Sequence, residues 1–213
     1  MKLIRTHIVL RASALVACAS MGMAQSPAGP HHPARNLQPV ARLPAPDLSP
    51  APVPFCFGDG SQAACPCDNT GAPGRGCDNS SGSGGAILWA TGHSRFSEDT
   101  VQLHVLGEPR TALSVVLQGD AAVRPAPFGD GVRCIGGNLT RLYVQNAVGG
   151  MLTVPEDGQR SLQVRSGALG DPIVNGDVRY YQVYYRDPQA RFCGAPQGGA
   201  FNVTNGVALT WVK

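Results

Sequence analysis

The 213-residue chain has few aromatic and few charged side chains, which make up 6% and 15% of it. Its basic residues form no run or stripe, and a nucleic-acid-binding protein needs such a stripe to displace counterions from phosphates. The sequence also lacks a Gly-x-Ser-x-Gly elbow, a His-Glu-x-x-His pair and a phosphate-binding loop. We therefore set nucleic-acid binding aside and predict a protein that is not an enzyme.

Residues 1–24 have the pattern of a signal peptide. Their charged residues are all basic, an apolar run follows over 12–23, and small residues precede a cut after Ala24. The run is too short to span a bilayer as a stable helix. We therefore expect a secreted or cell-envelope protein, near neutral once the three basic residues of the leader are removed. Residues 15–18 also match a lipobox, and lipid anchoring through Cys18 is the less favoured alternative.

Residues 25–54 are predicted to form a proline-rich linker. They contain nine of the chain's 18 prolines. Proline-rich sequence cannot form hydrogen-bonded ladders or bury much apolar surface, and it stays extended and solvated. We interpret this segment as a spacer between the export signal and the folded domain.

Cysteines carry the strongest signal in the rest of the chain. Four of them, Cys56, Cys65, Cys67 and Cys77, lie in a segment, 55–83, that is rich in Gly, Asn, Asp and Ser, and two more follow at Cys134 and Cys193. An even set in an exported chain indicates disulfides. A Cys₄ zinc site is the alternative, but structural zinc sites use pairs two to four residues apart, and this cluster has one pair separated by a single residue.

The pairing of the cysteines is only partly restricted by the sequence. Cys65 and Cys67 are too close along the chain to join without strain. The pairing that we favour is Cys56–Cys67, Cys65–Cys77 and Cys134–Cys193. An alternative within the cluster is Cys56–Cys65 with Cys67–Cys77. The predicted Cys134–Cys193 bridge closes a long loop and would contribute about 4 kcal/mol.

Residues 86–213 alternate apolar and polar side chains with period two, which is typical of strands. The apolar positions of six such runs are 101–105, 113–117, 152–154, 162–164, 181–185 and 207–211. Turn signals separate the runs, and no stretch combines helical spacing with caps. We predict an all-β fold, an antiparallel β-sandwich over 55–213 with an N-terminal disulfide-stapled loop segment at 55–83.

One predicted strand, 178–186, suggests a binding surface. Its alternation directs Tyr181, Val183 and Tyr185 into the core. The residues on its other face are Tyr180, Gln182, Tyr184 and Arg186. Tyrosines beside amide and guanidinium groups are suited to a sugar or a protein partner, so we predict binding there to an unknown extracellular protein or glycan. Simple cross-strand tyrosine packing is the alternative.

Two further chemistries have weaker support. Four acids lie in loops rich in Gly and Asn, where they could ligate calcium: Asp59, Asp68, Asp78 and Asp130. Because Asp and Asn are ordinary turn formers and no EF-hand pattern is present, we predict no metal and no cofactor. A small secreted hydrolase with an unrecognised site is the alternative function. Its candidate bases are His93 and His104, of which His104 falls on a solvent-facing strand position.

The combined motifs resemble an uncharacterised module of secreted proteins from planctomycete-type bacteria. They are Phe55-Cys56-Phe57-Gly58-Asp59-Gly60, Cys65-Pro66-Cys67, Gly74-x-Gly76-Cys77, Phe128-Gly129-Asp130-Gly131-x-Arg133-Cys134, Arg179-Tyr180-Tyr181-Gln182, Phe192-Cys193 and Phe201-Asn202-x-Thr204-Asn205-Gly206. The resemblance spans about 55–213 and implies a secreted accessory or surface module in which the cysteine-rich segment belongs to the sandwich domain. It carries over no catalytic residues. Asp68 and Asp78 depart from the glycine or variable residues expected there. We expect a monomeric, non-catalytic structural or binding module.

Overall fold

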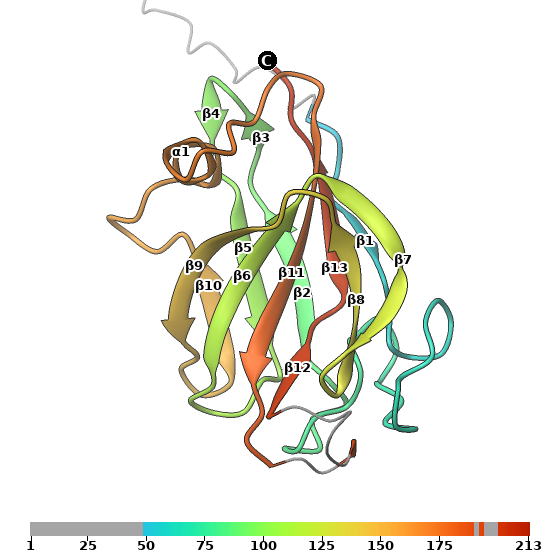
Figure 1. Cartoon of the computed structure of the whole chain (residues 1–213). Helices are drawn as coiled ribbons and strands as arrows, with labels where there is room; N and C mark the ends of the chain where they lie inside the picture. Colours follow the sequence, from blue (N-terminus) through green and yellow to red (C-terminus); the bar gives the residue numbers. More distant parts are fainter. Residues whose placement is uncertain (1–48, 190–191, 194–199) are drawn as a thin grey trace, which may run out of the picture. The chain divides into compact units, whose positions relative to one another are not determined.

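The computed structural model describes residues 49–189, 192–193 and 200–213, which Figure 1 draws in colour. The predicted signal peptide, Cys18 and most of the predicted linker lie outside the described residues. All of the described residues belong to one compact unit, 45–213. The linker is shorter than predicted at its C-terminal end, because Val53 and Pro54 already belong to the first strand, β1 (Val53–Phe55).

Two antiparallel sheets form the body of the domain, which confirms the all-β prediction. The larger sheet has the order β1, β13 (Gly206–Thr210), β11 (Val178–Arg186), β6 (Leu113–Gly119) and β9 (Thr140–Asn146), with β12 (Phe201–Val203) paired to the end of β11. The smaller sheet has the order β10 (Met151–Val154), β5 (Gln102–Leu106) and β2 (Ile87–Thr91), and lies behind the larger one in Figure 1.

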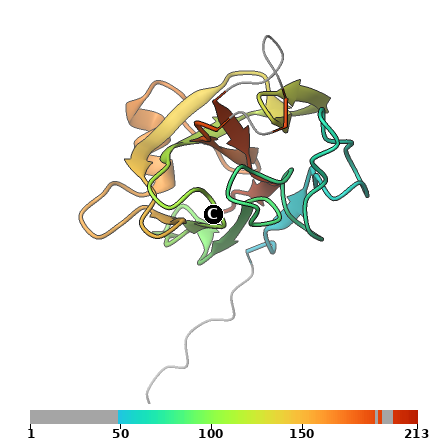
Figure 2. The same ribbon diagram turned by 90° about the horizontal axis from the view of Figure 1, so that it is seen from below.

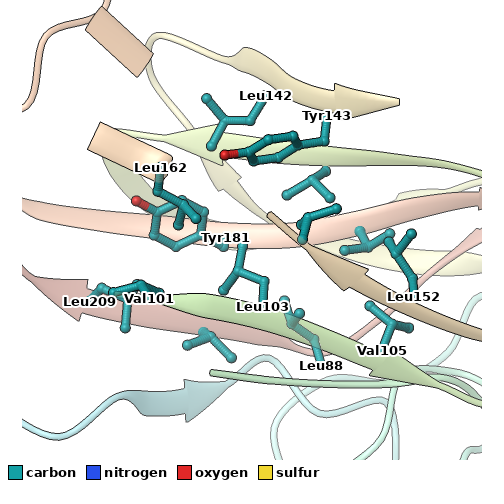
Figure 3. Packing of buried hydrophobic residues seen from close by; sticks show 14 of the residues in the cluster. Leu88, Val101, Leu103, Val105, Leu142, Tyr143, Leu152, Leu162, Tyr181 and Leu209 are labelled. Atoms are coloured by element: carbon teal, nitrogen blue, oxygen red, sulfur yellow. The ribbon is translucent and has the colours of Figure 1, made fainter. Parts of the chain in front are cut away.

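The core lies between these two sheets. Buried residues of β2 and β5, including Leu88, Leu103 and Val105, pack toward Tyr181 and Leu142 of the larger sheet (Figure 3). All five are at most 1% exposed. Full burial of an aliphatic side chain of this size contributes about 1.5–3 kcal/mol, so this layer is a major source of the attraction between the two sheets.

The face of strand β6 that packs into the core is not the face predicted from its sequence. Val116 and Gln118 are fully buried against the smaller sheet's side, whereas Val115 and Leu117 lie on the other face. The buried Gln118 is tolerated because the Tyr181 hydroxyl donates a 3.0 Å hydrogen bond to its Oε1. This reversal places apolar residues on the outer face of the larger sheet.

Two hairpins and one helix complete the domain. The hairpins are β3 (Ser94–Arg95) with β4 (Glu98–Asp99), and β7 (Ala121–Phe128) with β8 (Gly131–Gly136). The helix, α1 (Leu162–Ala168), occupies the run where a strand was predicted, and that prediction is wrong. Leu162 and Ser166 are buried at a spacing of four residues, one helical turn, while Val164 is 54% exposed.

The disulfides are Cys56–Cys134, Cys65–Cys77 and Cys67–Cys193. Only Cys65–Cys77 agrees with the predicted pairing, and both Cys56–Cys67 and Cys134–Cys193 are wrong. The error came from assuming that the cluster closes on itself. Instead β8 packs over β11 and brings Cys134 to Cys56, while Cys193 lies in the connection from β11 to β12. Figure 2 shows the cysteine-rich loops, in teal, along one side of the sheets. Three disulfides are consistent with an extracellular location.

Candidate functional site

The four residues of the predicted binding surface do share one face of β11, but other parts of the domain cover most of that face. Tyr180, Gln182, Tyr184 and Arg186 all lie opposite the core residues of the strand, as the alternation predicts. Gln182 is fully buried, Tyr180 and Tyr184 are half-buried, and only Arg186 is exposed. The sequence-based expectation of an open surface along the whole strand is therefore wrong.

The cover over Gln182 is the β7–β8 hairpin together with the Cys56–Cys134 disulfide. The Cys134 amide donates a 2.8 Å hydrogen bond to Gln182 Oε1. Gln182 Nε2 donates to the carbonyls of Val132 and Thr204 at 3.1 and 2.9 Å. The amide therefore connects the hairpin to the larger sheet from inside the domain and is not available to a ligand.

Tyr180 and Tyr184 lie on either side of this cover. The Tyr180 ring packs edge-to-face on Phe55, with centroids 5.8 Å apart. The Tyr184 ring lies 4.8 Å from the Phe201 ring and 6.0 Å from the Phe128 ring. The two tyrosines thus belong to separate aromatic clusters, and cross-strand packing describes Tyr180 better than ligand binding does.

The cluster at Tyr184 borders an open cavity of about 390 Å³, which we call the aromatic groove. Its lining residues are Val115 and Leu117 of β6, Tyr184 of β11, Arg141 of β9, Phe128 at the end of β7 and Phe201 of β12. The volume is within the range of small-molecule sites, which are mostly apolar with a few polar groups. Its floor is the apolar face of β6 that turned away from the core.

Gly129 allows the rings of Phe128 and Phe201 to come into contact. Its φ is +63°, and a Cβ at this position would lie 2.4 Å from the Phe201 carbonyl oxygen and 2.5 Å from the Phe201 ring. The next residue, Asp130, donates its amide to the same carbonyl at 3.0 Å. The hairpin turn therefore docks directly on β12 and brings the Phe128 and Phe201 centroids within 4.9 Å of each other.

Positive charge surrounds the aromatic groove. Arg141 is one of its lining residues. The Arg133 guanidinium lies 5.3 Å from the centroid of the Phe128 ring, a cation–π distance. Arg186 pairs directly with Phe201 across β11 and β12, so their side chains share a face. Among the described residues that line the groove, none is Asp or Glu.

The candidate bases of the alternative hydrolase lie elsewhere. His104 is on the outer face of the smaller sheet, where its ring stacks on Trp89 at 5.2 Å. Its Nε2 and Nδ1 are bonded to the hydroxyls of Thr91 and Thr153 at 2.8 and 3.1 Å. Partial burial lowers the pKa of His104 below its usual value. Both ring nitrogens of His104 are hydrogen-bonded to hydroxyls, so no described carboxylate forms with it the pair that general-base catalysis commonly uses.

Two of the four acids considered for calcium, Asp59 and Asp78, accept hydrogen bonds from nearby backbone amides. Asp59 accepts the amides of Gly74 and Ser61, which hold its pKa below the usual range. Asp78 accepts the amides of Gly84 and Gly85. Across the described ranges, no group of three or more His, Cys, Asp or Glu side chains is placed to hold a metal ion. The four cysteines considered for zinc are all consumed in disulfides.

Sequence reasoning identified one residue of the aromatic groove, Tyr184, and missed the rest. Phe128 is the first residue of the motif Phe-Gly-Asp-Gly, and Phe201 is the first residue of Phe-Asn-x-Thr-Asn-Gly. An aromatic residue at the start of both motifs was the sequence feature that could have pointed to the groove. Val115 and Leu117 were assigned to the core because the alternation does not say which face of a strand is buried. No sequence motif or pattern marked Arg141 as a residue of a binding site.

Comparison of the chain with protein-family models, with curated proteins and with solved structures finds no match. The resemblance to the secreted cysteine-rich module therefore stays a prediction that rests on its motifs. Within the described part of the chain, no helix has the length and apolar character needed to cross a membrane.

Proposed function

We propose that this chain is an exported, non-catalytic binding module that holds a sugar ring of an extracellular glycan in the aromatic groove. The observation that carries the proposal is the meeting of three half-buried rings, from Phe128, Tyr184 and Phe201, around an open cavity of about 390 Å³. Single exposed apolar side chains are common on protein surfaces, but aromatic rings that gather around a cavity are typical of binding sites.

A sugar fits the groove better than an apolar ligand does. Aromatic rings offer a flat apolar face with a polar tip, here the Tyr184 hydroxyl, and Arg141 adds hydrogen-bond donors at the rim. Pyranose rings present apolar C–H faces and hydroxyl edges, which complement both kinds of surface. The disulfides support a function outside the cell, where glycans are the abundant ligands.

The test compares two tyrosines of the same strand and face. Tyr184→Ala removes a ring of the groove, whereas Tyr180→Ala removes a ring of similar exposure that packs on Phe55 outside it. Binding of the purified domain to a glycan array, followed by calorimetry on the hits, is expected to show at least a tenfold loss for Tyr184→Ala and no loss for Tyr180→Ala. Thermal unfolding of both variants controls for folding. Equal binding by Tyr184→Ala, or an array without hits, contradicts the proposal.

A further inference from the structure

We infer that the sugar of the aromatic groove is acidic: a uronate whose carboxylate binds the Arg141 guanidinium. This inference rests on the proposed function and names the class of its ligand. It starts from the balance of charge at the groove, where one arginine lines the cavity, two more adjoin its rings, and no carboxylate is among the lining residues.

No described residue forms an ion pair that would neutralise the charge of Arg141. Arg141 is exposed on β9 and makes no ion pair with another described residue. By contrast, the buried Arg179 is paired with both Asp171 and Asp177, at 3.4 and 3.0 Å. A cation beside an apolar cavity, with no acid opposite it, favours an anionic ligand through charge complementarity.

The other two arginines are less suited to the contact. The Arg133 guanidinium is already placed over the Phe128 ring, and its Nε is buried. Arg186 shares a face with Phe201 but is not among the lining residues. Both add positive potential around the cavity, while Arg141 is the arginine among the described residues that line it. We therefore assign the carboxylate contact to Arg141.

A uronate satisfies both halves of the groove at once. Its pyranose ring can stack on Tyr184 or Phe201, and its carboxylate is fixed to the same ring within reach of the groove rim. Guanidinium and carboxylate match as a planar, bidentate pair, which a sugar hydroxyl cannot reproduce. Contact in a partly desolvated groove strengthens this pair relative to one in open water.

The experiment uses two ligands with the same sugar skeleton: trigalacturonic acid and its methyl-esterified form, in which each carboxylate is replaced by a neutral ester. Calorimetry on the mature chain is expected to give about tenfold tighter binding of the acid. Arg141→Gln should abolish this preference while it leaves binding of the ester unchanged, and Arg141→Lys should restore only part of it, because lysine lacks the planar fork. Rising salt should weaken binding of the acid alone.

The control is Arg110→Gln, which removes an exposed arginine that does not line the groove. It should keep the wild-type preference for the acid. Both variants change exposed side chains and should retain the wild-type melting temperature. A loss of preference in Arg110→Gln as large as that in Arg141→Gln would mean that net charge, rather than Arg141, selects the ligand, and would overturn the assignment.

A glycan array with neutral and uronate-containing oligosaccharides separates the two levels of the argument. Tyr184-dependent binding of uronates, with neutral sugars weak or absent, supports the inference. Tyr184-dependent binding of neutral sugars without preference for uronates overturns the acidic ligand and leaves the proposed function standing. Binding of no glycan through Tyr184 overturns both.

Discussion

Replacement of Gln182 by methionine tests the internal architecture most directly. The sequence predicts an exposed ligand-binding amide at this position, whereas the structure makes it a fully buried connection between the β7–β8 hairpin and the larger sheet. The two interpretations give opposite outcomes. An exposed glutamine can be replaced with changes within about 0.5 kcal/mol, but a buried one leaves its partners unsatisfied.

The expected loss follows from the three backbone groups that Gln182 satisfies, namely the Cys134 amide and the carbonyls of Val132 and Thr204. All three residues are at most 5% exposed, so water cannot replace the lost amide. Each buried group left without a partner costs about 1–3 kcal/mol. Methionine keeps the volume and recovers about 1–2 kcal/mol of apolar transfer. We expect a net loss of about 3 kcal/mol.

The assay is reversible unfolding in urea, with disulfides intact, followed by tyrosine and tryptophan fluorescence. A loss of about 3 kcal/mol corresponds to a fall in melting temperature of about 6–12 °C for a domain of this size. The control is Gln145→Met on β9, whose amide bonds to Glu156 and to the Thr153 carbonyl at the surface; it should change stability by less than about 0.5 kcal/mol. A Gln182→Met variant as stable as the Gln145→Met control would refute this account of the hairpin's attachment.

Three further predictions concern other parts of the domain. Burial raises the pKa of Glu108 to about 7, from about 4.5 when unfolded, so the folded state binds the proton more tightly. The free energy of unfolding should therefore fall by up to about 3 kcal/mol as the pH rises from about 4.5 to 7. Glu108→Gln should remove this pH dependence. Asp68 has a φ of 58°, so Asp68→Gly should stabilise the domain by about 0.5 kcal/mol in a urea titration, and a destabilised variant would contradict the strain argument. Peptide mapping should recover Cys67 joined to Cys193, whereas a peptide that joins Cys134 to Cys193 would support the pairing predicted from the sequence. Replacement of both Cys67 and Cys193 by serine should lower the free energy of unfolding by about 4–5 kcal/mol, because the bridge closes a loop of 126 residues.

The strand content of the domain could be predicted because each strand encodes its own alternation. Tyr181, Val183 and Tyr185 enter the core as the pattern of β11 indicates, and β5 does the same with Leu103 and Val105. The helix escaped prediction because α1 is only seven residues long and two apolar residues in it happen to alternate. A run of that length contains too few periods to separate 2.0 from 3.6 residues.

The disulfides could not be predicted for a different reason. Cys134 meets Cys56 because β8 packs on the outer face of β11. Cys193, which follows β11 in the chain, meets Cys67 of the cysteine-rich loops. These are facts of tertiary packing. The favoured pairing was right for Cys65–Cys77, whose partners are 12 residues apart, but spacing alone left the similarly short Cys67–Cys77 loop open.

The groove is a consequence of a sheet that is apolar on both faces. A sheet in a two-layer sandwich needs only one apolar face, yet β6 offers Val116 to the core and Val115 and Leu117 to the outside. The β7–β8 hairpin covers the outer face over Gln182 and ends at Phe128, beside Tyr184. The hairpin therefore does not cover the sheet beyond the aromatic rings, and Val115 and Leu117 line an open cavity together with Arg141. Larger side chains at Val115 or Leu117 would close this gap and bury more apolar surface, so the same substitutions that fill the groove should block the proposed ligand without loss of the fold.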